Sequence, residues 1–412
     1  MKTQARALAL GLLSSTVALA QPVLGPPTPV TPAVSLEGQA QARAVGTRDG
    51  FFVVWQAGVG RTAKVRGARL GLDGVSLDAA GLTLAEGAGG RFEPAVAFGH
   101  GVYFVAWSDL RDGHHAVYGA RVSPDGTVLD PGGILLTTDP GARMADVAAT
   151  PAGFLLAWAQ TTADGQGTEA RARRLGPDGT PLTPPVALTT APPWGAGEDF
   201  GHSALARAYC QQVRVAVDGT VAFVAWMGNL GHSQDIRIGR AVVNTETGAL
   251  VGAVDYAIPQ TQSRVADPAL ARLTDGGLFI SWTDHRGRGE LGLPEHNAIL
   301  LPAWPADGDL TRVSLREDGG AREVLRPVAA SAGVVAFVQG VENPQRQRRK
   351  EWRVRVRVVE AGGSPGPDVT VPGEAAWPAV VTGPTGVTLL VTTTVNTGGA
   401  DAGRLMGRLV SR

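Results

Sequence analysis

Cysteine is almost absent from this sequence, since Cys210 is the single one among 412 residues. No intramolecular disulfide can form, so stability has to come from the hydrophobic core. We interpret Cys210 as a small buried residue and not as a reactive thiol. An excess of charge of one sign is absent too, because 37 basic residues balance 37 acidic ones. A chain without a basic field gives no electrostatic reason to expect nucleic acid as a partner.

The motifs of several common enzyme classes are also missing. The sequence contains no H-E-x-x-H, no G-x-S-x-G, no phosphate-binding G-x-x-x-x-G-K-[ST] and no D-x-[DN]-x-[DN]-G calcium loop. Residues 123–127 come nearest to a sialidase repeat box, but their glycine stands one position early and the aromatic residue is lacking. We therefore expect no cofactor, and the sequence leaves open whether a divalent cation binds.

The first 20 residues have the pattern of a secretory signal peptide. Lys2 and Arg6 precede a short apolar run at residues 7–13, and Ala18-Leu19-Ala20 fits the cleavage signal. The run is shorter than the ~20 apolar residues that cross a bilayer, and we identify no other transmembrane segment. We therefore expect export to the periplasm or the extracellular space, with a Pro-rich segment at residues 21–31 preceding the folded domain.

Glycine and proline are abundant, with 56 and 28 residues, which is typical of many short strands joined by turns. An apolar strand recurs seven times and ends five times in tryptophan and twice in valine. Its last residues are Trp55, Trp107, Trp158, Trp226, Trp282, Val338 and Val391. These positions lie 51 to 68 residues apart. A period of about 50 residues, rich in β-branched and aromatic side chains, predicts four strands per repeat.

The repeats predict an all-β fold, a seven-bladed β-propeller of four-stranded antiparallel blades, formed by residues 32–412 as a single domain. A short strand rich in Ala and Val precedes each apolar strand, as at residues 94–98, and small side chains suit the crowded centre of a ring. The seventh repeat ends at its third strand. We therefore expect a strand at residues 32–36 to complete the last blade and to remove exposed sheet edges.

The second repeat carries the clearest family resemblance. It reads WSDLR at residues 107–111, VYGARV at residues 117–122 and PDG at residues 124–126. This pattern, W-x-D-x-R … YGARV-x-PDG, resembles the repeats of secreted bacterial β-propeller proteins, most of which are uncharacterised. The resemblance implies the fold and an extracellular setting, and it implies no activity.

The long polar loops are expected on one face of the ring, where six of the seven histidines then fall. Candidate ligand-binding residues in these loops are Asp109, Arg111, His114, His232, Asp284, His285 and Arg286. Asp and His could bind a divalent metal, and Arg could bind a carboxylate. An Asp and an Arg two residues apart could instead hold each hairpin together by hydrogen bonds. Because the pattern occurs in two repeats, we favour the hairpin interpretation.

The longest insertion in the repeat pattern, residues 191–210, contains Trp194, Glu198, Asp199 and His202. Aromatic rings and carboxylates suit carbohydrate recognition, which makes Trp194 a candidate ligand-binding residue. If the chain is an enzyme, Glu198, Asp199 and His202 are its candidate catalytic residues, since two carboxylates can hydrolyse a glycoside by acid–base chemistry. The alternative is a loop that only packs over its own blade.

A basic segment at residues 345–357 adds Arg348 and Arg349 to the candidate ligand-binding residues. It could bind an anionic polysaccharide, or it could be a solvated hairpin whose cations pair with acidic neighbours, which we favour.

We therefore predict a monomeric, exported, non-catalytic module that binds a glycan or a protein of the envelope or extracellular space on its loop-rich face. The alternative is a secreted polysaccharide hydrolase or lyase with its active site on that face. A structural part of an envelope complex is a third possibility.

Overall fold

The computed structural model of the chain describes residues 21–31, 37–165, 167–189, 209–229, 236–256, 265–272, 278–284, 295–301, 311–314, 324–331, 333–342, 350–359, 365–395 and 403–411. Almost all regular structure in these residues is β-strand, with one 3-10 turn at Gly60–Thr62. No helix in this part of the chain is long and apolar enough to span a bilayer.

The described strands form seven antiparallel sheets. Six of them are made of four strands that follow one another in the chain, and the last combines strands from both ends of the chain. The first three sheets are β3 (Gln39–Gly46), β4 (Gly50–Ala57), β5 (Lys64–Gly71) and β6 (Leu82–Ala85); β7 (Arg91–Gly99), β8 (Val102–Asp109), β9 (Ala116–Val122) and β10 (Ile134–Leu135); and β11 (Ala142–Thr150), β12 (Gly153–Thr161), β13 (Thr168–Leu175) and β14 (Val186–Ala187).

The next three sheets are β15 (Tyr209–Asp218), β16 (Val221–Asn229), β17 (Ile236–Asn244) and β18 (Leu250–Tyr256); β19 (Val265–Arg272), β20 (Leu278–Asp284), β21 (Glu295–Leu301) and β22 (Thr311–Ser314); and β23 (Val324–Ser331), β24 (Val334–Glu342), β25 (Lys350–Val359) and β26 (Pro365–Thr370). The last sheet contains β27 (Ala375–Thr382), β28 (Thr388–Thr394) and β29 (Leu405–Ser411), together with β1 (Val23–Leu24) and β2 (Thr28–Pro29).

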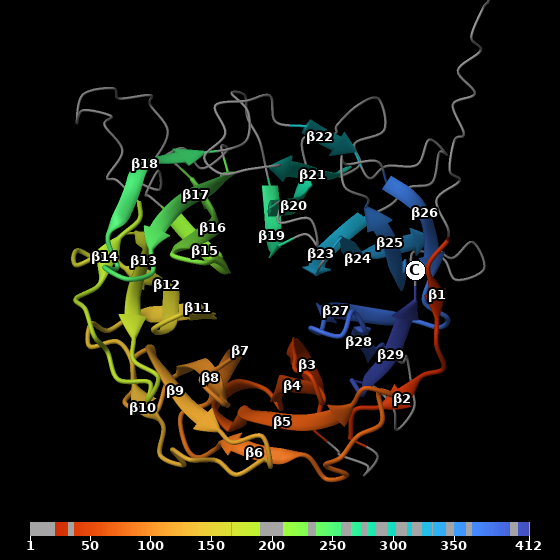
Figure 1. The fold of residues 1–412 in the computed structure, drawn as a ribbon, viewed down its shortest axis with the longest axis horizontal. Helices are drawn as coiled ribbons and strands as arrows, with labels where there is room; N and C mark the ends of the chain where they lie inside the picture. Colours follow the sequence, from red (N-terminus) through yellow and green to blue (C-terminus); the bar gives the residue numbers. More distant parts are fainter. Residues whose placement is uncertain are drawn as a thin grey trace, which may run out of the picture.

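The sheets surround a common centre, and the first long strand of each lies nearest to it (Figure 1). Strand β27 of the last sheet contacts β3 of the first, so the sheets follow one another around the whole ring. The predicted all-β fold of four-stranded antiparallel units is therefore confirmed.

The recurrent apolar strand is buried on both sides, which explains why its apolar residues run without interruption. In β4, Phe51, Val53 and Trp55 pack toward the last sheet, against residues such as Val391. The intervening residues of β4 pack toward β8 of the second sheet. Successive side chains of a strand point to opposite faces, so one strand supplies the hydrophobic core on both of its sides.

The N-terminal segment pairs with the last sheet, but through other residues than expected. Strands β1 and β2 both hydrogen-bond to β29, with Val23 opposite Ser411 and Thr28 opposite Gly407. The strand expected at residues 32–36 lies outside the described residues. Our boundary between a Pro-rich segment 21–31 and the domain is therefore wrong, because this segment is part of the last sheet. Its prolines are tolerated since an edge strand leaves some N–H positions unpaired.

The strand of each sheet that lies nearest to the common centre is called its central strand below. Each central strand contains a β-bulge near its start, and these bulges position the site described below. The register shifts in the seven sheets fall at Ala40/Arg43, Phe92/Ala95, Arg143/Asp146, Gln211/Arg214, Ala266/Ala269, Arg326/Val328 and Ala376/Ala379. Five bulge residues have φ between 52° and 55°: Gln41, Glu93, Met144, Gln212 and Trp377. Such a left-handed conformation costs a non-glycine residue about 1–3 kcal/mol, and a bulge redirects the side chain out of the regular pleat.

Candidate functional site in the central cavity

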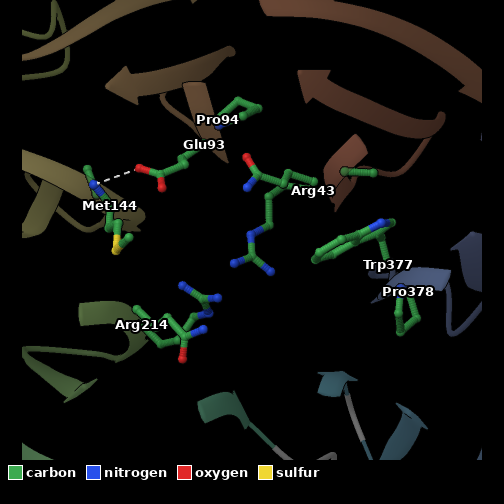
Figure 2. A pocket seen from close by; sticks show the side chains of 11 residues that line it. Arg43, Glu93, Pro94, Met144, Arg214, Trp377 and Pro378 are labelled. Carbon is green, nitrogen blue, oxygen red and sulfur yellow. Dashed lines mark hydrogen bonds between the residues drawn. The ribbon is translucent and has the colours of Figure 1, made fainter. Parts of the chain in front are cut away.

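The bulge residues meet in a cavity of about 190 Å³ between the central strands (Figure 2). Its lining includes all five of the left-handed residues: Gln41, Glu93, Met144, Gln212 and Trp377. The bulge itself recurs in every sheet, whereas the five left-handed residues are of four types, with glutamine present twice. The bulges therefore place side chains of different chemistry around one cavity.

Glu93 has one carboxylate oxygen fixed and the other free. Its Oε2 accepts a hydrogen bond from the Ser108 hydroxyl at 3.0 Å and another from the backbone N–H of Met144 at 3.2 Å. The Met144 N–H is shared with Ser108 Oγ, at 3.0 Å. No described residue donates to Oε1. The carboxylate is therefore oriented by two neighbouring sheets while one oxygen remains available to a ligand.

Two arginines also line this cavity, and each of them stands two positions after a bulge residue in the sequence. Arg43 follows the bulge in β3 and Arg214 follows the bulge in β15, and both side chains extend toward the middle of the cavity (Figure 2). Arg214 donates to the carbonyl of its neighbour Val213 at 2.7 Å. Arg43 has no hydrogen bond or ion pair with the described residues. Its guanidinium can therefore hold an anionic or hydroxyl-rich ligand.

Trp377 presents an indole ring to the cavity from the last sheet. The residue is 44% exposed and has a φ of 52°. A bulky residue in this backbone region is uncommon, and a large exposed aromatic side chain leaves apolar area in water. The combination provides a flat face on which a sugar ring can stack.

A second cavity, of about 310 Å³, adjoins the first and shares Gln41, Glu93 and Met144 with it. It adds His115, the residue before β9, and Arg143 from β11. Burial lowers the pKa of His115, the nearby Arg143 lowers it further, and Glu93 opposes this effect. The imidazole is therefore neutral at neutral pH and able to accept a proton or a hydrogen bond.

The predicted residues Asp109 and Arg111 lie in a buried hydrogen-bond cluster at the end of β8. Asp109 accepts from Trp107 Nε1 at 2.9 Å and from Arg111 Nη2 at 2.6 Å, and it is 1% exposed. Burial raises the pKa of Asp109, but the hydrogen bonds from Arg111 and Trp107 outweigh it and hold the pKa below the usual value. Arg111 also stacks over the Tyr118 ring at 3.9 Å. These contacts tie the hairpin to its own sheet and leave Asp109 out of reach of a ligand.

The other predicted residues are distributed differently. His114 is exposed and its neighbour His115 enters the second cavity, which is the alternation expected of adjacent residues. Asp284 is the last residue of β20, and only its backbone is described. Nine further predicted residues lie outside the described residues: Trp194, Glu198, Asp199, His202, His232, His285, Arg286, Arg348 and Arg349. Within the described part of the chain, no group of three or more metal-ligating side chains gathers.

Sequence reasoning missed the bulge residues, although one signal was available. In each repeat the residue just before the small or proline residue of the central strand varies in type, as in Glu93-Pro94 and Trp377-Pro378. In the fifth sheet, the register shift between Ala266 and Ala269 gives Asp267 the same bulge position. A position that varies inside a repeated frame can be found by aligning the repeats.

No protein-family model matches the sequence, and no curated protein matches it. Solved structures match it in fold. A protein of unknown function from Dyadobacter fermentans has a TM-score of 0.54 and 11% identity, with 95% of this chain and 99% of that chain covered. This identity shows a shared fold and nothing about activity.

Two further similar structures have a named activity. A thermostable family-43 glycoside hydrolase has a TM-score of 0.43 and 15% identity, with 72% of this chain and 97% of that chain covered. An α-L-arabinanase from Penicillium chrysogenum, complexed with arabinobiose, has a TM-score of 0.47 and 12% identity, with 77% of this chain and 92% of that chain covered.

The prediction of a non-catalytic binding module is corrected by these findings. The similar structures with a named activity are carbohydrate-cleaving enzymes, and the central cavity holds an oriented carboxylate with a free oxygen. What this chain does has to be argued from its own cavity.

Proposed function

We propose that the chain is a seven-bladed β-propeller enzyme that cleaves a polysaccharide in its central cavity, most simply as a hydrolase. The observation that carries the proposal is Glu93, whose Oε2 is fixed by Ser108 and Met144 while Oε1 remains free within the cavity. A carboxylate held in this way can transfer a proton to or from a substrate without first having to be oriented.

The surrounding residues fit a carbohydrate better than a flat apolar ligand. Trp377 offers a stacking face, and Arg43 offers hydrogen-bond donors to sugar hydroxyl groups. Gln41 and Gln212 add amide groups that can donate and accept. A sugar ring presents both an apolar face and many hydroxyl groups, so it can use each of these side chains.

Hydrolysis breaks the bond between the anomeric carbon and the glycosidic oxygen. One carboxyl group donates a proton to that oxygen, and the oxygen of water forms the new bond to the anomeric carbon, with a second carboxylate as base or nucleophile. We assign Glu93 to one role. Candidates for the second carboxylate are Asp267, by its bulge position in β19, and Glu198 or Asp199 in the segment between β14 and β15. This acid–base chemistry requires no cofactor.

The proposed location of the enzyme outside the cytoplasm follows from its proposed substrate. A polysaccharide is too large to enter a cell intact, and the signal-peptide pattern of residues 1–20 supports export to the periplasm or the extracellular space. We propose that the mature enzyme acts there as a monomer, with the glycan as its partner.

The test uses purified residues 21–412 and a panel of neutral and acidic polysaccharides, with new reducing ends as the readout. Glu93→Gln should lower the rate by roughly 100-fold or more, since it removes a proton-transfer group while keeping the size of the side chain. The matched control is Glu246→Gln, at an exposed glutamate in the turn between β17 and β18. Full activity of Glu93→Gln, or no cleavage of any polysaccharide by the unchanged chain, would contradict the proposal.

Single variants of Asp267, Glu198 and Asp199 then identify the second carboxylate. The variant that loses as much activity as Glu93→Gln marks the partner. A lyase would instead create a new carbon–carbon double bond, which ultraviolet absorbance detects and which hydrolysis does not produce.

A further inference from the structure

The second cavity contains polar groups that its own walls do not satisfy. Arg143 Nε and His115 Nδ1 are both buried, and neither has a hydrogen-bond partner among the described residues. Arg143 makes no hydrogen bond or ion pair to any of these residues. A buried donor or acceptor without a partner loses the hydrogen bonds that water gave it, so these two groups indicate a place for a bound polar ligand.

Positive charges outnumber negative charges around the two cavities. Among the described lining residues there are three arginines, Arg43, Arg143 and Arg214, and one carboxylate, Glu93. Glu93 forms no ion pair with Arg143, and a single carboxylate cannot balance three arginines. A concave site with an excess of cations raises the local concentration of anionic ligands.

The lining of the second cavity suits a carboxylate group. Gln41 and Gln56 line it with amide groups, and Phe92 lies beside the His115 ring with 6.3 Å between the ring centroids. An arginine can bind both oxygens of a carboxylate with two parallel hydrogen bonds, and the imidazole and amide groups can bind the adjoining hydroxyl groups of a sugar.

We propose that the second cavity is a subsite for the carboxylate of a uronic acid unit, bound by Arg143 with His115 beside it. The substrate is then an acidic polysaccharide, one of whose uncleaved sugar units places its carboxylate in this subsite next to Glu93. This inference deepens the proposed function and rests on it for the identity of the substrate, but the binding step itself requires no cleavage.

The test measures binding in the Glu93→Gln variant, so that turnover does not interfere. Isothermal titration compares a galacturonate trisaccharide with the corresponding neutral galactose trisaccharide. The acidic sugar should bind about 10-fold or more tightly, because hydrogen bonds to charged groups are stronger than those between neutral groups. Adding Arg143→Gln should abolish the difference, and Arg143→Lys should keep only part of it, since lysine lacks the planar fork.

The matched control is Arg48→Gln, at an exposed arginine in the turn between β3 and β4, which should leave both affinities unchanged. Circular dichroism of each variant establishes that it is folded. Equal binding of the two trisaccharides, or an undiminished preference in the Arg143→Gln variant, would overturn the subsite. Equally tight binding of a sulfated trisaccharide would overturn its assignment to a carboxylate. Cleavage of neutral polysaccharides without any preference for the acidic sugar would sink the subsite and leave the proposed function standing.

Discussion

Glu93 of the second sheet accepts a hydrogen bond from the backbone N–H of Met144 in the third, at 3.2 Å. Both residues occupy bulge positions with φ near 55° and 52°. The bulge of one sheet therefore orients the side chain that projects from the bulge of the sheet before it. The carboxylate is held by the junction between two sheets, so its position depends on how these sheets pack.

The first prediction concerns Ser108, which donates to Glu93 at 3.0 Å and is fully buried. Ser108→Ala should lower kcat/KM about 10-fold by letting the Glu93 carboxylate rotate, at a cost of about 1 kcal/mol in unfolding free energy for the lost hydrogen bond. Kinetics over a range of pH and denaturant unfolding measure the two effects. A role in stability alone would leave the pH profile of kcat/KM unchanged, whereas a change in that profile indicates positioning of the carboxylate.

The second prediction separates two effects of Trp377, which are the backbone strain at its positive φ and the contribution of its indole ring to binding. Trp377→Gly should raise the unfolding free energy by about 1 kcal/mol relative to Trp377→Ala, because glycine adopts a positive φ without the cost that other residues incur. Both variants should lose affinity for oligosaccharides to the same extent, because both remove the indole ring. Denaturant unfolding and titration with a sugar ligand check this pair. Equal stability of the two variants would show that the bulge is unstrained.

The third prediction concerns a salt bridge on the rim of the second sheet. Asp130 accepts from the Arg121 side chain, with both contacts at 2.9 Å, and from the Arg121 backbone N–H, also at 2.9 Å. The Arg121 side chain holds the pKa of Asp130 below the usual 3.8, although burial opposes it. A lowered pKa means that the stabilisation is present above the unfolded-state value and is lost as pH falls through the folded-state value.

Asp130→Asn should therefore lower the unfolding free energy by about 1 kcal/mol at neutral pH. The difference from the unchanged chain should disappear below the folded-state pKa. Urea unfolding at a series of pH values tests this expectation, with Asp49→Asn as the control at an exposed carboxylate outside the cluster. A difference that persists undiminished in acid would exclude the ion pair as its cause.

The fourth prediction concerns the N-terminal segment. Val30 is fully buried in the core between the first and last sheets, whereas Val23 is 63% exposed on the edge strand β1. Val30→Ala should destabilise the protein by about 2 kcal/mol through lost burial and the cavity left behind, while Val23→Ala should change stability by less than about 0.5 kcal/mol. Thermal unfolding of both variants makes the comparison. Similar melting temperatures would show that residue 30 does not hold the last sheet.

The strands could be predicted from the sequence because the apolar runs and turn residues that define them lie within each single repeat. The run that ends at Trp107 is apolar on both faces, and the turn at residues 124–126 needs a glycine at Gly126, where φ is 94°. The spacing of Asp109 and Arg111 fits a ligand site as well as a hairpin. The occurrence of the pattern in two repeats favoured the hairpin, and the burial of Asp109 agrees with that interpretation.

Glu93 was missed because the bulge that directs it is a property of strand pairing. The varied residue types at the bulge positions become visible only when the repeats are aligned. The segment around Thr28 and Pro29 was misjudged for a related reason. Prolines argue against a strand in the interior of a sheet, but these residues pair at an edge. Where the seven central strands meet, and which side chains face one another there, depends on closure of the ring and not on any single repeat.

The bulges also have a consequence for how such a chain changes over time. Each bulge residue projects away from the apolar layers that hold the sheets together, so exchanging it alters the lining of the cavity with little effect on folding. Gln41, Glu93, Met144 and Trp377 occupy equivalent places with unrelated side chains, which illustrates this tolerance. New specificities can therefore arise by single substitutions at these few positions. A library that varies only the bulge residues would sample this range while the framework stays constant.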